Sequence, residues 1–203
     1  MEFETYSHKH GKQLLDGEYK ELWIEISEAL KSIKDSDLIK QFPKSSNNMS
    51  ISSTVNDLIR ERLTKKGWTK EAQIFQDEEY SQKRETVWRL DFAKKDVSVE
   101  VSFNHGEALA WNLTKPVLAS EQNHVRKAIQ TNIGVIILVT EEFKKAGAFD
   151  NAVGSYEKAI RYLKPMDRIL TVPLLLIGLK APKSFVIKKT EKKGRHVGIV
   201  KKI

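Results

Sequence analysis

Residues 90–105, LDFAKKDVSVEVSFNH, decide the fold, because apolar and polar side chains alternate along them. The alternation begins at Thr86 and is clearest in residues 97–101, where every second residue is a valine. A period of two residues predicts β-strands. The stretch Ala93–Asp96 separates two alternating runs, so the sequence predicts a hairpin of two strands joined by a polar turn.

Two carboxylates and a hydroxyl lie on this hairpin. Asp91 ends the first strand, and Glu100 and Ser102 lie two residues apart on the second, so the latter two project from one face. The hairpin would bring Asp91 back against that face, where the carbonyl of Val101 adds a further oxygen. Such a site suits Mg²⁺, which uses few protein ligands, stabilises charge on a phosphodiester and activates water. Taken alone, however, the spacing favours a turn aspartate and a polar residue on a solvated strand face.

Patterns elsewhere in the chain predict helices and buried strands around this hairpin. Apolar residues three and four apart, or a helix-favouring composition, predict four helices at residues 14–33, 55–66, 107–120 and 151–163. Two apolar runs predict strands buried on both faces, at residues 132–140 and 171–179.

The order of these elements predicts an α/β fold with a mixed sheet flanked by helices and a helical N-terminal third. We expect one domain over residues 1–203. Residues 42–53 are expected to form a loop, Thr54 to cap the second helix, Gly67 to end it, and Gly154 to interrupt the last helix.

Composition limits the class of protein. The chain is 40% hydrophobic and 31% charged, which is typical of a folded globular protein. No run approaches the roughly 20 apolar residues of a membrane span, and the start has no signal-peptide pattern, so we expect a cytoplasmic protein with no membrane partner. The absence of cysteine excludes disulfides, cysteine-ligated zinc and a cysteine nucleophile. Any metal must bind oxygen or imidazole.

Positive charge is concentrated at the C-terminus. The chain has a formal net charge of +8, and residues 183–203 hold eight lysines or arginines against one acid, Glu191, a local balance of +7. This basic tail either clamps phosphates or serves as a solvated, solubilising end. Charge alone does not decide between these functions.

Five blocks of the chain resemble one family of nucleases. The stretch LDFAKKDVSVEVSF resembles the active-site hairpin of type II restriction endonucleases of the BglII/BstYI family, a branch of the PD-(D/E)XK nuclease superfamily. Four further blocks resemble that family in its own order: TVNDLIRERLTKKGW (54–68), NIGVIILVT (132–140), NAVGSYEKAIRYL (151–163) and TVPLLLIGL (171–179). The resemblance implies a restriction-endonuclease-like fold and a homodimer that encloses duplex DNA and cleaves both strands at a palindrome, with Mg²⁺ as cofactor. It further implies a GATC-centred site and a cognate DNA methyltransferase encoded nearby.

By position, the resemblance makes Asp91 and Glu100 metal ligands and the Val101 carbonyl a third one. Ser102 falls at the third active-site position, where the superfamily usually has lysine and this branch glutamine or glutamate. A serine hydroxyl is neither charged nor a useful base near neutral pH. The alternative is therefore a catalytically impaired DNA-binding protein on the nuclease fold. A second alternative is a repair or structure-specific nuclease with the same fold. A third, an RNA-binding or structural protein, would explain the basic tail but not the paired carboxylates.

Residues for DNA recognition follow from the same resemblance. Asn104, His105 and Asn151 match positions that contact the major groove. Asparagine can make two hydrogen bonds to adenine, and histidine can donate to the acceptor atoms of guanine. A loop-capping asparagine and a surface histidine are the ordinary interpretations. Lys94 and Lys95, in the hairpin turn, are candidates for DNA binding or for replacing the missing function of Ser102, although exposed turn residues are the simpler interpretation.

Overall fold

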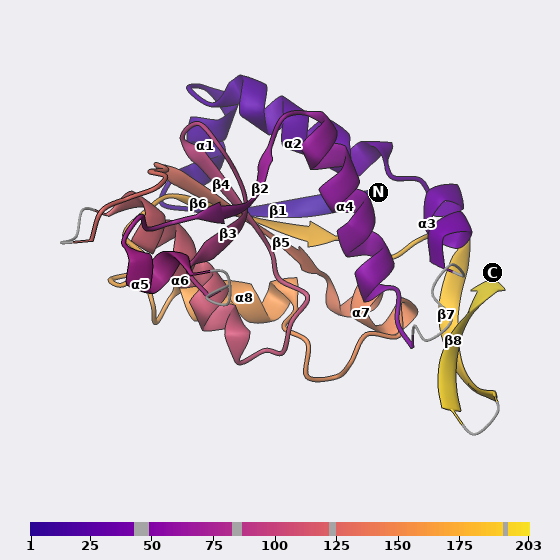
Figure 1. Cartoon of the computed structure of the whole chain (residues 1–203). Helices are drawn as coiled ribbons and strands as arrows, with labels where there is room; N and C mark the ends of the chain where they lie inside the picture. The colour runs from indigo at the N-terminus through magenta and orange to yellow at the C-terminus, as the bar shows by residue number, and fades with distance from the viewer. Residues whose placement is uncertain (43–48, 83–86, 122–124, 193–194) are drawn as a thin grey trace.

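A six-stranded mixed sheet forms the centre of the molecule (Figure 1). The computed structural model describes residues 1–42, 49–82, 87–121, 125–192 and 195–203. In spatial order the strands are β1 (Phe3–His8), β6 (Leu174–Leu179), β5 (Ile133–Val139), β4 (Val97–Val101), β3 (Arg89–Lys94) and β2 (Thr69–Gln73). The three central strands, β4 to β6, run parallel, and the outer pairs are antiparallel. This is the mixed sheet that the sequence predicts.

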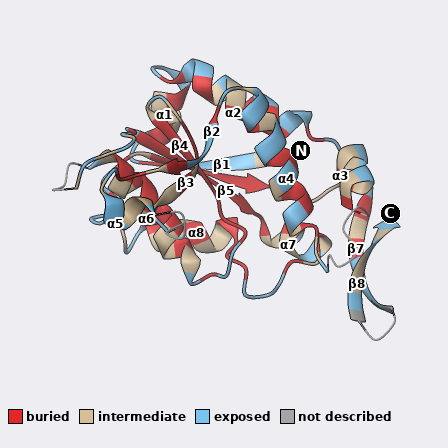
Figure 2. Ribbon diagram, in the orientation of Figure 1, coloured by how far each residue is buried: buried red, intermediate tan, exposed pale blue. Residues whose placement is uncertain are grey.

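Helices cover both faces of the sheet, with α2 and α4 on one side and α6 and α8 on the other (Figure 1). The helices are α1 (Gly11–Asp16), α2 (Lys20–Ser32), α3 (Asp35–Gln41), α4 (Ser52–Lys65), α5 (Glu78–Ser81), α6 (Ala108–Ser120), α7 (Glu141–Ala146) and α8 (Tyr156–Leu163). In β5, Val135 and Ile137 pack toward α2 and α4, whereas Ile136 and Leu138 pack toward α6 and α8. All seven residues of β5 are buried, which confirms the predicted two-sided strand (Figure 2).

Helix α6 approaches the sheet closely at one glycine. A Cβ added to Gly134 of β5 would lie 2.6 Å from Cβ and Cγ of Pro116, which is inside α6. Because real Cβ contacts are not that short, only glycine leaves room for Pro116 at this point. The contact fixes the height of α6 above β4 and β5.

Several predicted boundaries in the N-terminal part are wrong. The predicted helix 14–33 is divided into α1 and α2, with a break at Gly17–Tyr19. Helix α4 begins at Ser52 after the N-cap residue Ile51, so Thr54 is a buried residue inside the helix and not its cap. Residues 43–48 of the predicted loop lie outside the described residues. Gly67, with φ of +81°, follows the end of α4 as predicted.

The hairpin and the last helix also differ in their limits. Thr86 lies outside the described residues, and the first strand of the hairpin begins at Arg89 and continues to Lys94, so that only residues 95–96 form the turn. Helix α8 begins at Tyr156, because the Ser155 hydroxyl accepts from the Lys158 N–H and caps it there. Residues 151–155 lie outside the helix.

The N-terminal third is mainly helical as predicted, but the sequence analysis missed the two edge strands of the sheet, β1 at the start of the chain and β2 just after α4. β1 pairs antiparallel with β6, and β2 pairs with β3. Four of the six residues of β1 are exposed, so this strand lacks the apolar pattern that identified β5.

The basic C-terminal segment is folded. β7 (Phe185–Lys192) and β8 (Arg195–Lys202) form a two-stranded antiparallel hairpin that projects from the body of the protein (Figure 1). Phe185 and Ile187 are buried and anchor it. Its charged residues include four exposed lysines, Lys188, Lys189, Lys201 and Lys202.

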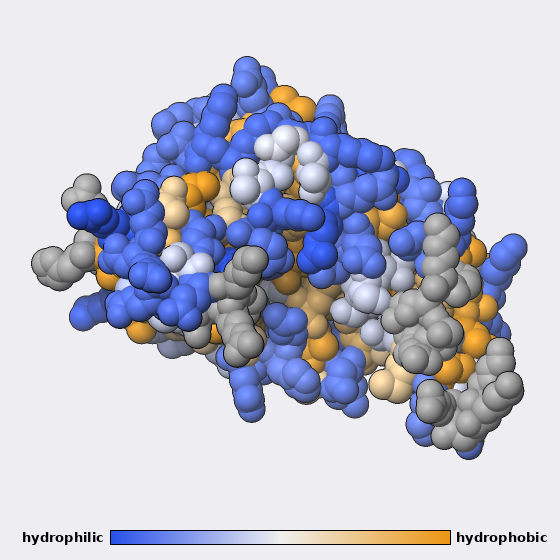
Figure 3. All heavy atoms as spheres, in the orientation of Figure 1, coloured by the Kyte–Doolittle hydropathy of each residue, from blue (hydrophilic) through white to orange (hydrophobic). Residues whose placement is uncertain are grey.

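The face drawn in Figure 3 is mainly hydrophilic, with apolar atoms in scattered groups. Among the described helices, none combines the length and the apolar character needed to cross a membrane.

Candidate active site

Asp91 and Glu100 meet where the pairing of β3 with β4 ends. The Cα register runs from Lys94 opposite Val97 to Phe92 opposite Val99. Beyond that pair, the Val101 N–H donates to Asp91 Oδ2 at 2.7 Å, and the Asp91 N–H donates to Glu100 Oε1 at 3.1 Å. Each carboxylate is thus oriented by the backbone of the opposite strand, as the hairpin prediction requires.

Helix α6 contributes two polar side chains that the sequence analysis missed. Lys115 Nζ donates to Glu100 Oε2 at 2.8 Å, and Asn112 Nδ2 donates to Ser102 Oγ at 2.9 Å. Asn112 and Lys115 are three residues apart and therefore share one side of the helix. The available signal was that Lys115 is the one charged residue of the α6 sequence, ALAWNLTKPVLAS.

The electrostatics of the site are set by burial. Glu100 is 1% exposed and Lys115 is 8% exposed. Burial and, to a smaller extent, the nearby Asp91 carboxylate raise the pKa of Glu100 to about 8, although Lys115 opposes both effects. Burial also raises the pKa of Asp91, while the hydrogen bond from the Val101 N–H lowers it. One ammonium faces two carboxylates, so when both are ionised a negative charge remains for a cation to neutralise.

The donor set fits a hard divalent cation. Carboxylate oxygens of Asp91 and Glu100 lie side by side, and the carbonyl of Val101, which accepts a 3.3 Å hydrogen bond from the Phe103 N–H, has a second lone pair. Within the described parts of the chain, no group of three or more histidine, cysteine, aspartate or glutamate residues is placed to hold a metal. Mg²⁺ matches this small oxygen set, because it commonly keeps several waters and takes substrate phosphate oxygens.

Ser102 lies where the sequence places it, on the same face as Glu100. It is 2% exposed, and its N–H donates to the Ile137 carbonyl at 2.8 Å, which continues the pairing of β4 with β5. Because Asn112 donates to the Ser102 oxygen, the hydroxyl proton remains available to another acceptor.

The two hairpin lysines do not reach the carboxylates. Lys94 Nζ lies 2.8 Å from both carboxylate oxygens of Glu25 on α2, and it also donates to the Lys66 carbonyl at 2.7 Å, on the opposite face of the sheet from Lys115. Lys95 is exposed in the turn, with φ of 49°. The idea that Lys94 compensates for Ser102 is therefore wrong, because strand alternation directs its side chain to the opposite face of the sheet.

The predicted base-reading residues lie together on two neighbouring loops. Asn104, His105 and Asn151 are exposed. The loops are joined by hydrogen bonds from the Gly154 N–H to the Asn104 carbonyl at 3.2 Å and from the Gly106 N–H to the Ala152 carbonyl at 2.5 Å. Both follow the carboxyl ends of parallel strands, β4 and β5, so one surface carries all three side chains beside the carboxylates.

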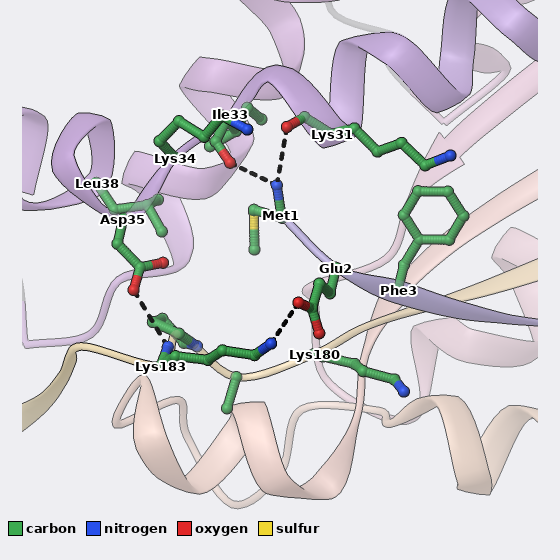
Figure 4. Close-up of a pocket in the computed structure, with 12 residues that line it drawn as sticks. Met1, Glu2, Phe3, Lys31, Ile33, Lys34, Asp35, Leu38, Lys180 and Lys183 are labelled. Atoms are coloured by element: carbon green, nitrogen blue, oxygen red, sulfur yellow. Dashed lines mark hydrogen bonds and ion pairs between the residues drawn. The ribbon is translucent and has the colours of Figure 1, made fainter.

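A cavity of about 780 Å³ lies elsewhere, between the start of β1, α2, α3 and the segment after β6 (Figure 4). Its lining includes Glu2, Lys34 and Lys183, and none of the predicted site residues. Asp35 and Glu2 bind Lys183 across it, which links the start of β1 and of α3 to the segment between β6 and β7.

Comparisons with known proteins place the chain in a family. The model of the family described as restriction endonuclease BglII/BglIII matches residues 3–179. No curated protein sequence matches the chain significantly. Among solved structures, the chain resembles restriction endonuclease BglII complexed with a DNA 16-mer, with a TM-score of 0.67 and 18% identity over 99% of this chain and 100% of that one. It also resembles free BglII, with a TM-score of 0.59 and 19% identity over the whole of both chains. The chain therefore belongs to the BglII/BglIII family of restriction endonucleases, which are type II site-specific deoxyribonucleases.

Proposed function

We propose that this protein is a Mg²⁺-dependent type II restriction endonuclease that hydrolyses both strands of palindromic duplex DNA. The observation that carries the proposal is the reciprocal bonding of Asp91 and Glu100 across the hairpin, beside the exposed loops at residues 104–105 and 151. Convergent carboxylates repel DNA phosphates unless a cation lies between them. Their retention at a DNA-facing site therefore supports catalysis.

Each group has a task in this mechanism. Asp91, Glu100 and the Val101 carbonyl would hold Mg²⁺, which when bound stabilises charge on the scissile phosphate and lowers the pKa of a water. The Val101 N–H fixes the direction of the Asp91 carboxylate, and the Asp91 N–H fixes that of Glu100. The free proton of the Ser102 hydroxyl can orient an attacking water but cannot act as its base.

Sequence recognition and assembly belong to the same proposal. Asn104, His105 and Asn151 would read base edges in the major groove. Two copies related by a two-fold axis would read the same half-site on each strand, which gives a palindrome, and we propose a GATC centre as in this branch of the family. The solved relative bound to a DNA 16-mer supports duplex DNA as the partner. A host would need a cognate DNA methyltransferase, encoded nearby, to protect its own genome.

The test is digestion of unmethylated phage DNA by the purified protein, with Mg²⁺ and with EDTA, followed by sequencing of the fragment ends. Discrete fragments formed only with Mg²⁺ and sharing a palindrome are the expected result. Intact DNA in every lane, from protein that still shifts a duplex in a gel, would make this a DNA-binding protein on a nuclease fold. Analytical ultracentrifugation of the same sample tests the dimer.

A further inference from the structure

We propose that Lys115 is the active-site amine of this enzyme, acting from helix α6 in place of the side chain that Ser102 does not supply. Its ammonium would contact the scissile phosphate beside Glu100. This inference rests on the proposed function, because it assigns a residue to that same site.

The first argument is position. Lys115 Nζ lies 2.8 Å from Glu100 Oε2, and one turn earlier Asn112 holds the hydroxyl of Ser102. The amine therefore faces the carboxylates from the side on which the third active-site position lies. Pro116, packed on Gly134, holds this part of the helix close to the sheet.

The second argument is that burying the Lys115–Glu100 ion pair costs both groups their hydration. A buried ion pair contributes little to stability compared with apolar residues of similar volume, because both charges lose their hydration. An apolar residue at position 115 would suit the buried side of α6, which includes Leu109, Leu113 and Ala119. Stability therefore does not account for a lysine here, whereas a phosphate-binding site does.

The third argument is that the ammonium of Lys115 has hydrogen-bond donors left for a substrate. An ammonium has three donor hydrogens. Within the described residues, the bond to Glu100 is the one hydrogen bond that Lys115 makes. By contrast, Lys94 binds Glu25 and the Lys66 carbonyl and so is committed to the fold. Lys115 retains donors for a substrate oxygen.

The absence of cysteine from the chain allows a specific test. Lys115→Cys introduces a unique thiol, which can be alkylated in denaturant before refolding. Alkylation with 2-bromoethylamine gives a side chain of nearly the size and charge of lysine. Alkylation with 2-iodoethanol gives a neutral side chain of the same length. These two proteins differ only in the terminal group, an ammonium or a hydroxyl, so the comparison separates the role of the ammonium from that of packing.

The first measurement is single-turnover cleavage with saturating Mg²⁺. Lys115→Met and the hydroxyethylated protein should cleave about 100-fold more slowly or worse, as expected for loss of a positioned catalytic group. The aminoethylated protein should recover to within about tenfold of the wild type. Equal rates for the two alkylated proteins, or a Lys115→Met rate within about threefold of the wild type, overturn the proposal.

The second measurement is DNA binding in EDTA, which needs neither metal nor cleavage. Loss of one phosphate contact should reduce the slope of log K against log salt by about 0.9 in the hydroxyethylated protein but not in the aminoethylated one. Lys12→Met is the matched control, since it removes a lysine that is ion-paired with Asp16 on α1 and should leave the slope unchanged. If the wild type cuts no DNA, the proposed function fails, and the slopes on a random-sequence duplex still decide: an unchanged slope removes Lys115 from the DNA surface.

Discussion

The backbone N–H of Val101 donates to Asp91 Oδ2 at 2.7 Å, so the residue proposed to give a carbonyl to the metal also orients the neighbouring carboxylate. Asp91→Asn should preserve this bond through its amide oxygen while removing the charge. We expect a folded protein with cleavage reduced at least about 100-fold and with weaker binding of Mn²⁺, measured by calorimetry. Glu79→Gln, on α5, is the control of equal charge change. Cleavage by Asp91→Asn near the wild-type rate would exclude this carboxylate from the metal site.

The pH dependence of stability should report the burial of Glu100. Its pKa is raised from 4.5 to about 8 in the folded, metal-free protein. The stability that this group contributes is therefore fully present below pH 4.5 and is lost as the pH rises through 8.

Relative to the wild type, Glu100→Gln should gain stability from pH 5 to 8, by on the order of 1 kcal/mol per pH unit, in urea unfolding with EDTA. The quantity to compare is the difference in unfolding free energy between Glu100→Gln and the wild type at each pH. The variant also weakens the partner of Lys115, but this changes the difference by a similar amount at every pH and so has little effect on its slope. A difference independent of pH would show that Glu100 titrates normally.

The hydroxyl of Ser102 should matter more for stability than for catalysis. Ser102→Ala leaves Asn112 Nδ2 without its acceptor in a buried site, which costs about 1–3 kcal/mol. If Lys115 supplies the amine, single-turnover cleavage should fall by less than about tenfold. Adding Asn112→Leu to Ser102→Ala should restore part of the stability, measured by urea unfolding. A loss of cleavage as large as that expected for Asp91→Asn would instead make the hydroxyl essential.

The lysines of the β7–β8 hairpin should strengthen DNA binding without specifying sequence. β7 contacts α7, which follows β5 at the same end of the sheet as the Asn151 loop. Changing Lys188 and Lys201 to glutamine should weaken binding uniformly, with each lost phosphate contact reducing the salt slope by about 0.9. The cleaved sequence should stay the same. Lys20→Gln with Lys40→Gln gives the same charge change on exposed helical residues; equal effects from the two pairs would mean that the hairpin is only a solvated end.

Gly134 should be essential for the placement of α6. Gly134→Ala puts a Cβ 2.6 Å from Pro116 and 2.8 Å from Leu174 Cδ2, so the helix must shift. We expect a loss of roughly 1–3 kcal/mol, with cleavage reduced beyond the fraction unfolded because Lys115 moves with the helix. Gly17→Ala, where the nearest contact would be 3.4 Å, is the control. Unchanged unfolding and cleavage would show that this close packing is not required.

How far the sequence predicts this protein depends on how local each signal is. The strand β5 was predicted from its continuous apolar run, and the hairpin from the alternation of apolar and polar residues along its strands. The edge strand β1 has no such pattern, since its pairing with β6 is made by backbone groups and four of its residues are exposed.

The same limit applies to the site. Asp91, Glu100 and Ser102 lie on adjacent strands, so alternation was enough to place them on one face. Lys115 reaches Glu100 only through the packing of α6 on the sheet, which no local pattern encodes. Lys94 is the opposite case. It is close to Asp91 in sequence, but its side chain projects to the opposite face of the sheet and binds Glu25.

The chain order of the site has a mechanical consequence. Asn104 and His105 lie on the short connection between β4, which ends with Glu100 and Val101, and α6, which carries Lys115. In the proposed mechanism, a base contact that displaces this connection would act at once on the proposed metal ligand Glu100 before it and on the proposed amine of Lys115 after it. A wrong base would disturb both catalytic groups together, so this arrangement allows cleavage to discriminate between sequences more sharply than binding does.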